Sequence, residues 1–212
     1  MDFRSQISPT VLLAGEMTPT ARAVAAGLGN QGVTLGICAP EPVTAAYLCR
    51  DLTASGLLAL PFHSRPGHIE DISRLLADLA TDLGPLDALV DLSPVDPADL
   101  TAGPATPDVP WPALPVPFRL TWAVAQSIRA TGRSGRVVLL NRRAPDGDSG
   151  GDRSPRAPVR QWAGHGITID TVDPVPGSEP YPAEPIVRLL TRRPGVAAPR
   201  AAHGRHQQQE QR

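Results

Sequence analysis

Polar and charged side chains follow the short apolar runs of this sequence, at the places where parallel strands would end. Most are of types that carry out acid–base or nucleophilic chemistry, and in chain order they are Glu16, His63, Asp91, Ser93, Asn141, Arg142, Arg143 and Asp173. Ligands of open α/β sheets bind outside the carboxyl ends of the strands. The sequence therefore predicts a ligand-binding edge here, with candidate ligands His63, Asn141, Arg142 and Asp173.

Three kinds of chemistry could use subsets of these residues. A His, an Asp and a Ser are the types needed for nucleophilic hydrolysis, but no Gly-x-Ser-x-Gly pattern surrounds Ser93 to present it as the nucleophile. Asp91 and Asp173 would serve as a carboxylate pair in an isomerase or cyclase, although caps of strand ends explain them equally well. Arg142 and Arg143 would clamp an anion, or simply begin a solvated loop.

The elements that must position these residues alternate between strand and helix patterns, which predicts a parallel sheet covered by helices. Strands are expected at 10–15, 33–38, 57–61, 86–91, 136–141 and 167–172. Helices are expected at 19–29, at 42–54, around Ile69, Ile72, Leu75, Leu76 and Leu79, at 118–131 with Leu120, Ala123, Val124 and Ile128 inward, and at 183–192. This order predicts a three-layer, doubly wound parallel sheet of about six strands.

Residues 1–193 are expected to form one domain, and residues 194–212 a disordered tail. Two irregular segments rich in proline, glycine and aspartate interrupt the domain, at 92–116 and 142–158. Long loops inside compact domains tend to be functional or mobile, so either segment could border the site.

Composition narrows the function classes. The net charge of -1 gives no reason to expect nucleic acid or an anionic membrane surface as a partner. All 20 residues counted as Lys or Arg are Arg, so no chemistry that needs a lysine can occur. Cys38 and Cys49 are expected to be reduced packing residues, and no spacing predicts a metal site. Neither a signal peptide nor a membrane helix is recognisable, which predicts a cytoplasmic protein.

Four segments, taken in order, resemble the short-chain dehydrogenase/reductases, the SDR family. They are TVLLAGEMTPTARAVAAGL, LGPLDALVDLSP, FRLTWAVAQSIRATGRSGRVVLLN and GHGITIDTVDPVPG, and they span roughly residues 10 to 177. The resemblance implies a Rossmann-like, NAD(P)-binding fold and the activity of an NAD(P)-dependent oxidoreductase of the ketoreductase type.

The phosphate-binding turn departs from the family pattern T-G-x-x-x-G-x-G. Ala14 and Gly15 occupy its first two places, but Pro19 and Ala21 stand where the other two glycines belong. Proline lacks a backbone N–H and its ring crowds the turn. The resemblance leaves a vestigial cofactor site of four residues, Gly15, Thr18, Asp91 and Ser93.

The residues that would contact the adenosine half of the cofactor also differ from the family pattern. Glu41 is the acid that could reach a ribose, and the first turn of the following helix is the other explanation for it. The family's Asp after the third strand aligns with His63, and its N-N-A-G stretch appears here as Asp91-Leu92-Ser93-Pro94.

The family's catalytic groups are absent from the matching positions. Ala113 stands at the Asn position and Arg142 at the Ser position, and the interval 142–165, where the Tyr-x-x-x-Lys helix belongs, contains neither Tyr nor Lys. The only tyrosines are Tyr47 and Tyr181. We therefore assign no catalytic residue and expect a truncated, degenerate member without the catalytic helix and last strand of the family.

Three functions remain open. The first is a non-catalytic auxiliary protein that binds no cofactor and recognises a protein partner, a second copy of itself or a small molecule. The second is an NAD(P)-dependent oxidoreductase that holds its cofactor in an unusual way. The third is a non-redox enzyme, such as an isomerase or cyclase, in a biosynthetic pathway; a decayed copy without function is the remaining explanation.

Overall fold

A single parallel sheet of six strands forms the centre of the protein in the computed structural model, which describes residues 8–65, 68–95, 109–141, 166–173 and 183–191. The strand order is β3-β2-β1-β4-β5-β6. The strands are β1 (Thr10–Ala14), β2 (Thr34–Ala39), β3 (Ala59–His63), β4 (Ala88–Val95), β5 (Gly135–Asn141) and β6 (Ile167–Val172). The helices are α1 (Pro19–Gly29), α2 (Pro42–Ala54), α3 (Ile69–Leu83), the short 3-10 helix η2 (Trp111–Ala113), α5 (Val116–Ala130) and α7 (Ala183–Thr191).

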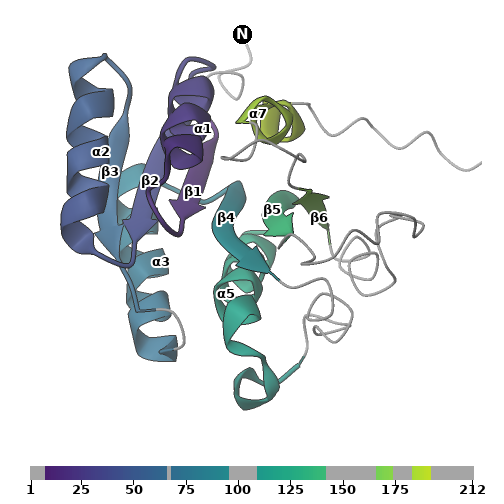
Figure 1. The fold of residues 1–212 in the computed structure, drawn as a ribbon. Helices are drawn as coiled ribbons and strands as arrows, with labels where there is room; N and C mark the ends of the chain where they lie inside the picture. Colours follow the sequence, from purple (N-terminus) through teal and green to yellow (C-terminus); the bar gives the residue numbers. More distant parts are fainter. Residues whose placement is uncertain (1–7, 66–67, 96–108, 142–165, 174–182, 192–212) are drawn as a thin grey trace, which may run out of the picture.

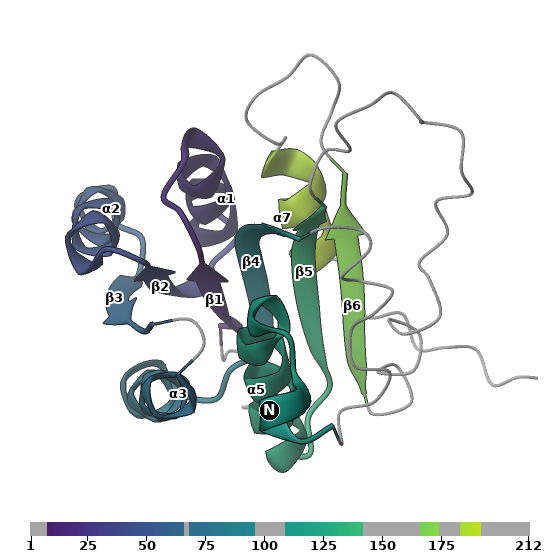
Figure 2. The same cartoon turned by 60° about the horizontal axis from the view of Figure 1, so that its bottom comes forward.

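Helices cover both faces of the sheet, as the edge-on view in Figure 2 shows. One layer contains α1, α2 and α7, and the other contains α3 and α5 (Figures 1 and 2). Successive strand residues point to opposite faces, so each layer packs over its own apolar cluster. The prediction of a three-layer, doubly wound α/β fold is confirmed.

The limits of β3 and β4 differ most from the sequence prediction. β3 starts two residues later than expected because Leu57 still closes the end of α2, where its amide bonds Leu52 O at 3.1 Å. β4 continues past residue 91 to Val95 through a shift in register against β5. Residues 92–95, which were predicted to be irregular, therefore belong to β4, and residues 96–108 lie outside the described part of the chain.

The inner face of α5 also differs in part. Leu120 and Ala123 were expected inside but are only half-buried, whereas Phe118 and Thr121 are buried. Thr121 is 2% exposed, and its hydroxyl has no hydrogen-bond partner in the described structure. Cys38 and Cys49 are free and buried, as predicted.

Several predictions fall outside the described residues. They concern Arg142 and Arg143, Tyr181, the segment 142–158 and the tail 194–212, so the domain limits and the absence of a catalytic helix and last strand stay predictions. Among the described helices, none is both long enough and apolar enough to cross a membrane.

The strand order reverses its direction at β1, since the chain first moves outward through β2 and β3 and then returns to add β4 on the other side. The carboxyl ends of β1 and β4 are therefore neighbours at the point where the strand order reverses. Dinucleotides bind at such a switch point in doubly wound sheets. This position contains the residues considered next.

Candidate functional site

Gly15 begins the turn that leaves β1, and only glycine fits there. Its φ of 117° lies in the left-handed region, which side chains disfavour. A Cβ at this position would lie 3.1 Å from Ser93 N and 3.2 Å from the carbonyl carbon of Leu92. The Gly15 amide bonds Cys38 O at 3.0 Å. The turn is thus fixed against β2 on one side and packed against the end of β4 on the other.

The rest of this turn presents backbone donors at the start of α1. Thr18 caps the helix, with its Oγ1 accepting from Ala21 N at 3.3 Å, and Pro19 takes the first helical position. In the described part of the chain, the amides of Glu16 and Met17 donate to no protein acceptor. Free amides beside a helix N-terminus attract anions, because the helix dipole adds positive potential there. The turn is therefore suited to bind a phosphate group.

Asp91 lies beside this turn, in a row of side chains that crosses the sheet. The register aligns Ala14 of β1 with Cys38 on one side and Asp91 on the other, and extends the row to Phe62 and Leu139. All five side chains point to the face covered by α3 and α5. Asp91 is 5% exposed and carries the one carboxylate of the row.

Burial determines the ionisation of Asp91. Loss of hydration raises its pKa to about 6, although Ser93 opposes this by donating from its backbone amide at 2.9 Å and from its hydroxyl. In the described structure no arginine pairs with Asp91. The same burial raises the pKa of the Cys38 thiol to about 11, so Cys38 is a packing residue and not a nucleophile.

Ser64 is a polar residue of the edge that the sequence analysis missed. It follows β3 directly and is 6% exposed, and its hydroxyl has no hydrogen-bond partner in the described structure. Its backbone amide donates to Cys38 Sγ. The predicted strand ended at Pro61, which placed Ser64 in a loop. Because a buried hydroxyl without a partner is unusual, this position is suited to hydrogen-bond a ligand.

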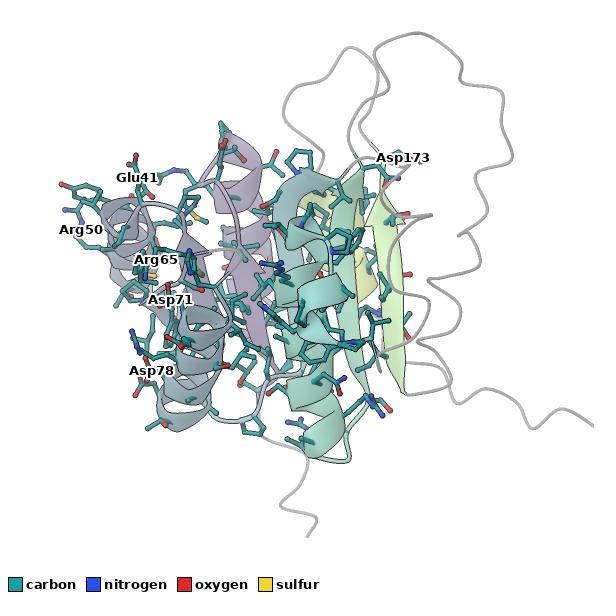
Figure 3. All side chains as sticks on the ribbon, turned by 90° about the horizontal axis from the view of Figure 1, so that it is seen from below. Glu41, Arg50, Arg65, Asp71, Asp78 and Asp173 are labelled. Atoms are coloured by element: carbon teal, nitrogen blue, oxygen red, sulfur yellow. The ribbon has the colours of Figure 1, made fainter. Side chains whose placement is uncertain are left out.

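The outer strands contribute Glu41 and His63. Glu41 precedes α2 at its N-cap, where its side chain makes no capping hydrogen bond and is exposed. His63 is the last residue of β3 and is also exposed. Arg65 is held by Asp71, whose carboxylate lies 2.6 Å from Arg65 Nε (Figure 3). Glu41 is thus an exposed acid at this end of the sheet, and it makes no capping hydrogen bond with α2.

The other end of the edge brings together Asn141 and Asp173, two of the residues that the sequence analysis named as candidate ligands. Asn141 Nδ2 donates to Asp173 Oδ1 at 2.5 Å, because β5 and β6 pair in parallel and end side by side. Figure 3 shows Asp173 at the opposite side of the sheet from Glu41. The candidate residues therefore line a long edge rather than a compact centre.

Neither predicted catalytic set is assembled. Asp91 aligns with Leu139 on β5, whereas Asp173 bonds Asn141, so the two carboxylates do not form a pair. His63 is on β3, separated from Asp91 on β4 by β2 and β1, so the hydrolytic trio is not formed. Across the described residues, no three His, Cys, Asp or Glu side chains are grouped so that they could hold a metal ion.

Comparison with known proteins supports the fold. The sequence matches no protein-family model and no curated protein sequence. Solved structures do match. A metagenomic short-chain oxidoreductase in complex with NADP has a TM-score of 0.61 and 20% identity, with 87% of this chain and 90% of that one covered. A variant of actinorhodin polyketide ketoreductase with NADPH has a TM-score of 0.58 and 22% identity, with coverages of 79% and 70%.

A third structure, a short-chain type dehydrogenase/reductase from Mycobacterium marinum, has a TM-score of 0.58 and 17% identity, with coverages of 79% and 75%. The chain thus has the fold of the short-chain dehydrogenase/reductases, and the likeness noted in its sequence is confirmed at the level of the fold.

These matches contradict one prediction. No cofactor was expected, because Pro19 and Ala21 replace glycines of the phosphate turn, yet two of the matched structures contain NADP or NADPH. The structure also shows why the argument from Pro19 was too strong. Proline at the first helical position removes a donor that the helix does not use, while the amides of Glu16 and Met17 precede it and are retained.

Proposed function

We propose that this protein binds a nicotinamide dinucleotide across the carboxyl edge of its sheet. The observation that carries the proposal is the turn from Gly15 to Thr18, which presents the amides of Glu16 and Met17 beside the start of α1 at the switch point of the sheet. The pyrophosphate would lie against these amides. The dinucleotides in two of the matched structures support the same ligand class.

The two halves of the ligand would extend to opposite sides of the turn. The adenosine half would cover the ends of β2 and β3, where Glu41 would accept from the ribose hydroxyls and the Ser64 hydroxyl would gain a partner. The nicotinamide half would lie over β4 and β5, toward Asn141.

Glu41 favours NAD(H) over NADP(H). An acid at the end of the second strand binds the free 2′-hydroxyl, whereas a 2′-phosphate would be repelled by it. Two described arginines near this end are already paired, Arg50 with Asp51 and Arg65 with Asp71. The preference proposed here therefore differs from the NADP and NADPH of the two matched structures.

The bound nicotinamide would supply a site for hydride transfer, but this chain offers no Tyr–Lys couple to deliver the accompanying proton. No lysine occurs in the sequence, and Tyr47 lies on α2 with the Arg50 guanidinium 5.1 Å from its ring. We therefore propose a dinucleotide-binding auxiliary protein that recognises a partner or ligand and does not reduce ketones by this route. Its cytoplasmic location stays a prediction.

Isothermal titration of the full chain with NAD⁺, NADH and NADPH tests this proposal. We expect binding of NAD⁺ and NADH, with NADPH weaker. Glu41→Ala should weaken NADH binding about tenfold, the loss of one hydrogen bond to a charged group, and should strengthen NADPH binding. Asp78→Ala is the matched control, since Asp78 is an exposed acid far from Glu41 in Figure 3. The absence of binding by all three nucleotides would refute the proposal.

A turnover assay separates the auxiliary role from the oxidoreductase. When NADH is mixed with the protein and simple ketones, its absorbance should fall no faster than in a control without the protein. Consumption of NADH that Glu41→Ala slows would favour the oxidoreductase instead.

A further inference from the structure

Asp91 is a buried acid that dinucleotide binding does not require. It is 5% exposed, lies in a row that is otherwise without charge, and pairs with no described arginine. A glutamine or asparagine would accept the same hydrogen bond from Ser93 N without a charge. The charge of this carboxylate is therefore the property that could affect a ligand bound beside it.

The contacts connect Asp91 directly to the phosphate-binding turn. Its Oδ1 accepts from Ser93 N at 2.9 Å, and Ser93 N lies 3.1 Å from the point where a Gly15 Cβ would be. Ala14, the residue before Gly15, is its partner in the register between β1 and β4. One peptide group thus separates the carboxylate from the turn, at a depth where water screens the charge weakly.

We propose that Asp91 makes dinucleotide binding proton-linked, so that the protein takes up a proton at this carboxyl when the anionic ligand binds at the turn from Gly15 to Thr18. This inference rests on the proposed function. Negative charge on the pyrophosphate disfavours negative charge on Asp91, and protonation of Asp91 removes the repulsion.

The sign of the pH dependence follows from the free protein. Burial holds the pKa of Asp91 at about 6 before the ligand binds, and the ligand raises it further. Affinity is therefore highest below about pH 6 and falls as pH rises through that value, until Asp91 is ionised in the complex too. If binding raises the pKa by about one unit, affinity falls about tenfold in all.

The described elements around Asp91 carry few other ionisable groups. β1 has none, and Cys38 on β2 has a pKa of about 11. Arg136 on β5 pairs with Asp170 at 3.3 Å, and the buried faces of α3 and α5 are without charge. Among the described residues, His63 at the end of β3 and His68 before α3 are exposed histidines, and a variant of His63 serves as the control for the strand edge.

Titration calorimetry with NAD⁺ at about pH 5 and about pH 8 tests the linkage, because a dinucleotide diphosphate keeps its charge over this range. Wild type and His63→Gln should each bind about tenfold more weakly at the higher pH. A third titration at about pH 6.5, between the pKa values of Asp91 in the free and bound protein, should show proton uptake as a dependence of the heat on the buffer. Asp91→Asn should bind equally well at both pH values and more tightly than wild type at pH 8. Asp78→Asn should behave as wild type.

Two results would overturn the inference separately from the proposed function. Wild-type binding that is independent of pH, or a pH dependence that survives in Asp91→Asn, would refute the linkage and leave the dinucleotide site intact. No binding by either protein at either pH would refute both. An NMR titration of the Asp91 carboxyl, whose pKa should rise when NAD⁺ is added, gives a readout that does not depend on affinity.

Discussion

Replacing Asp91 by Asn is expected to stabilise the protein at neutral and alkaline pH. The folded state raises the pKa of this carboxyl from 3.8 to about 6, so ionisation is harder in the folded than in the unfolded chain. The free energy of unfolding must then fall as pH rises through this range, and the loss is complete above pH 6. Two pKa units correspond to about 3 kcal/mol.

Asn at this position should avoid that loss, because its side-chain oxygen can still accept from Ser93 N. Urea denaturation of Asp91→Asn and wild type, measured at intervals between about pH 4 and about pH 8, checks the prediction. The two free energies of unfolding should nearly agree at the acid end. They should then diverge until the variant is about 3 kcal/mol more stable, a large part of the stability of an ordinary domain.

The difference between the two proteins isolates Asp91, since all other groups titrate alike in both. Asp78→Asn, a change of the same kind at an exposed site, should leave the free energy of unfolding close to that of wild type. If Asp91→Asn were less stable than wild type at pH 8, or if the difference were constant, the account of this buried carboxyl would be wrong.

Two further changes test the phosphate-binding turn. Gly15→Ala should lower the free energy of unfolding in urea by about 2–3 kcal/mol, because the residue has a φ of 117° and its Cβ would approach Ser93 N. Gly32→Ala, at a φ of 77° with open space around the added Cβ, should lower it clearly less. Equal losses would contradict the packing argument. Thr18→Ala should lower the melting temperature by an amount that corresponds to about 1 kcal/mol, the stability lost with the cap, whereas Thr18→Ser should retain most of that stability. A melting temperature that Thr18→Ala leaves unchanged would refute the role of Thr18 as a cap.

Local signals made much of the fold predictable. Thr18 followed by Pro19 marks the start of α1, and the structure begins the helix there, since a hydroxyl cap and a proline at the first position act on adjacent residues only. The limits of β3 and β4 were harder to predict from the sequence. They depend on how Leu57 closes α2 and on a register shift against β5, and both are set by distant partners.

The sequence could predict that the candidate residues lie along one edge of the sheet, but not which of them contact one another. Strand ends located Asp91, Asn141 and Asp173, yet only the register shows that Asn141 meets Asp173 and that Asp91 stands apart. Backbone donors such as the Glu16 amide leave no trace in residue types, because every residue except proline has one. The argument from missing glycines therefore underestimated the capacity of the turn to bind an anion.

The central claim, that a dinucleotide lies against the turn after β1, is tested most directly by the amide resonances of the protein during titration with NAD⁺. We expect the largest chemical-shift changes at Glu16 and Met17, whose N–H groups would acquire phosphate acceptors. Saturating NAD⁺ that leaves both amides unmoved, or that shifts a different part of the surface, would contradict the assignment of this site.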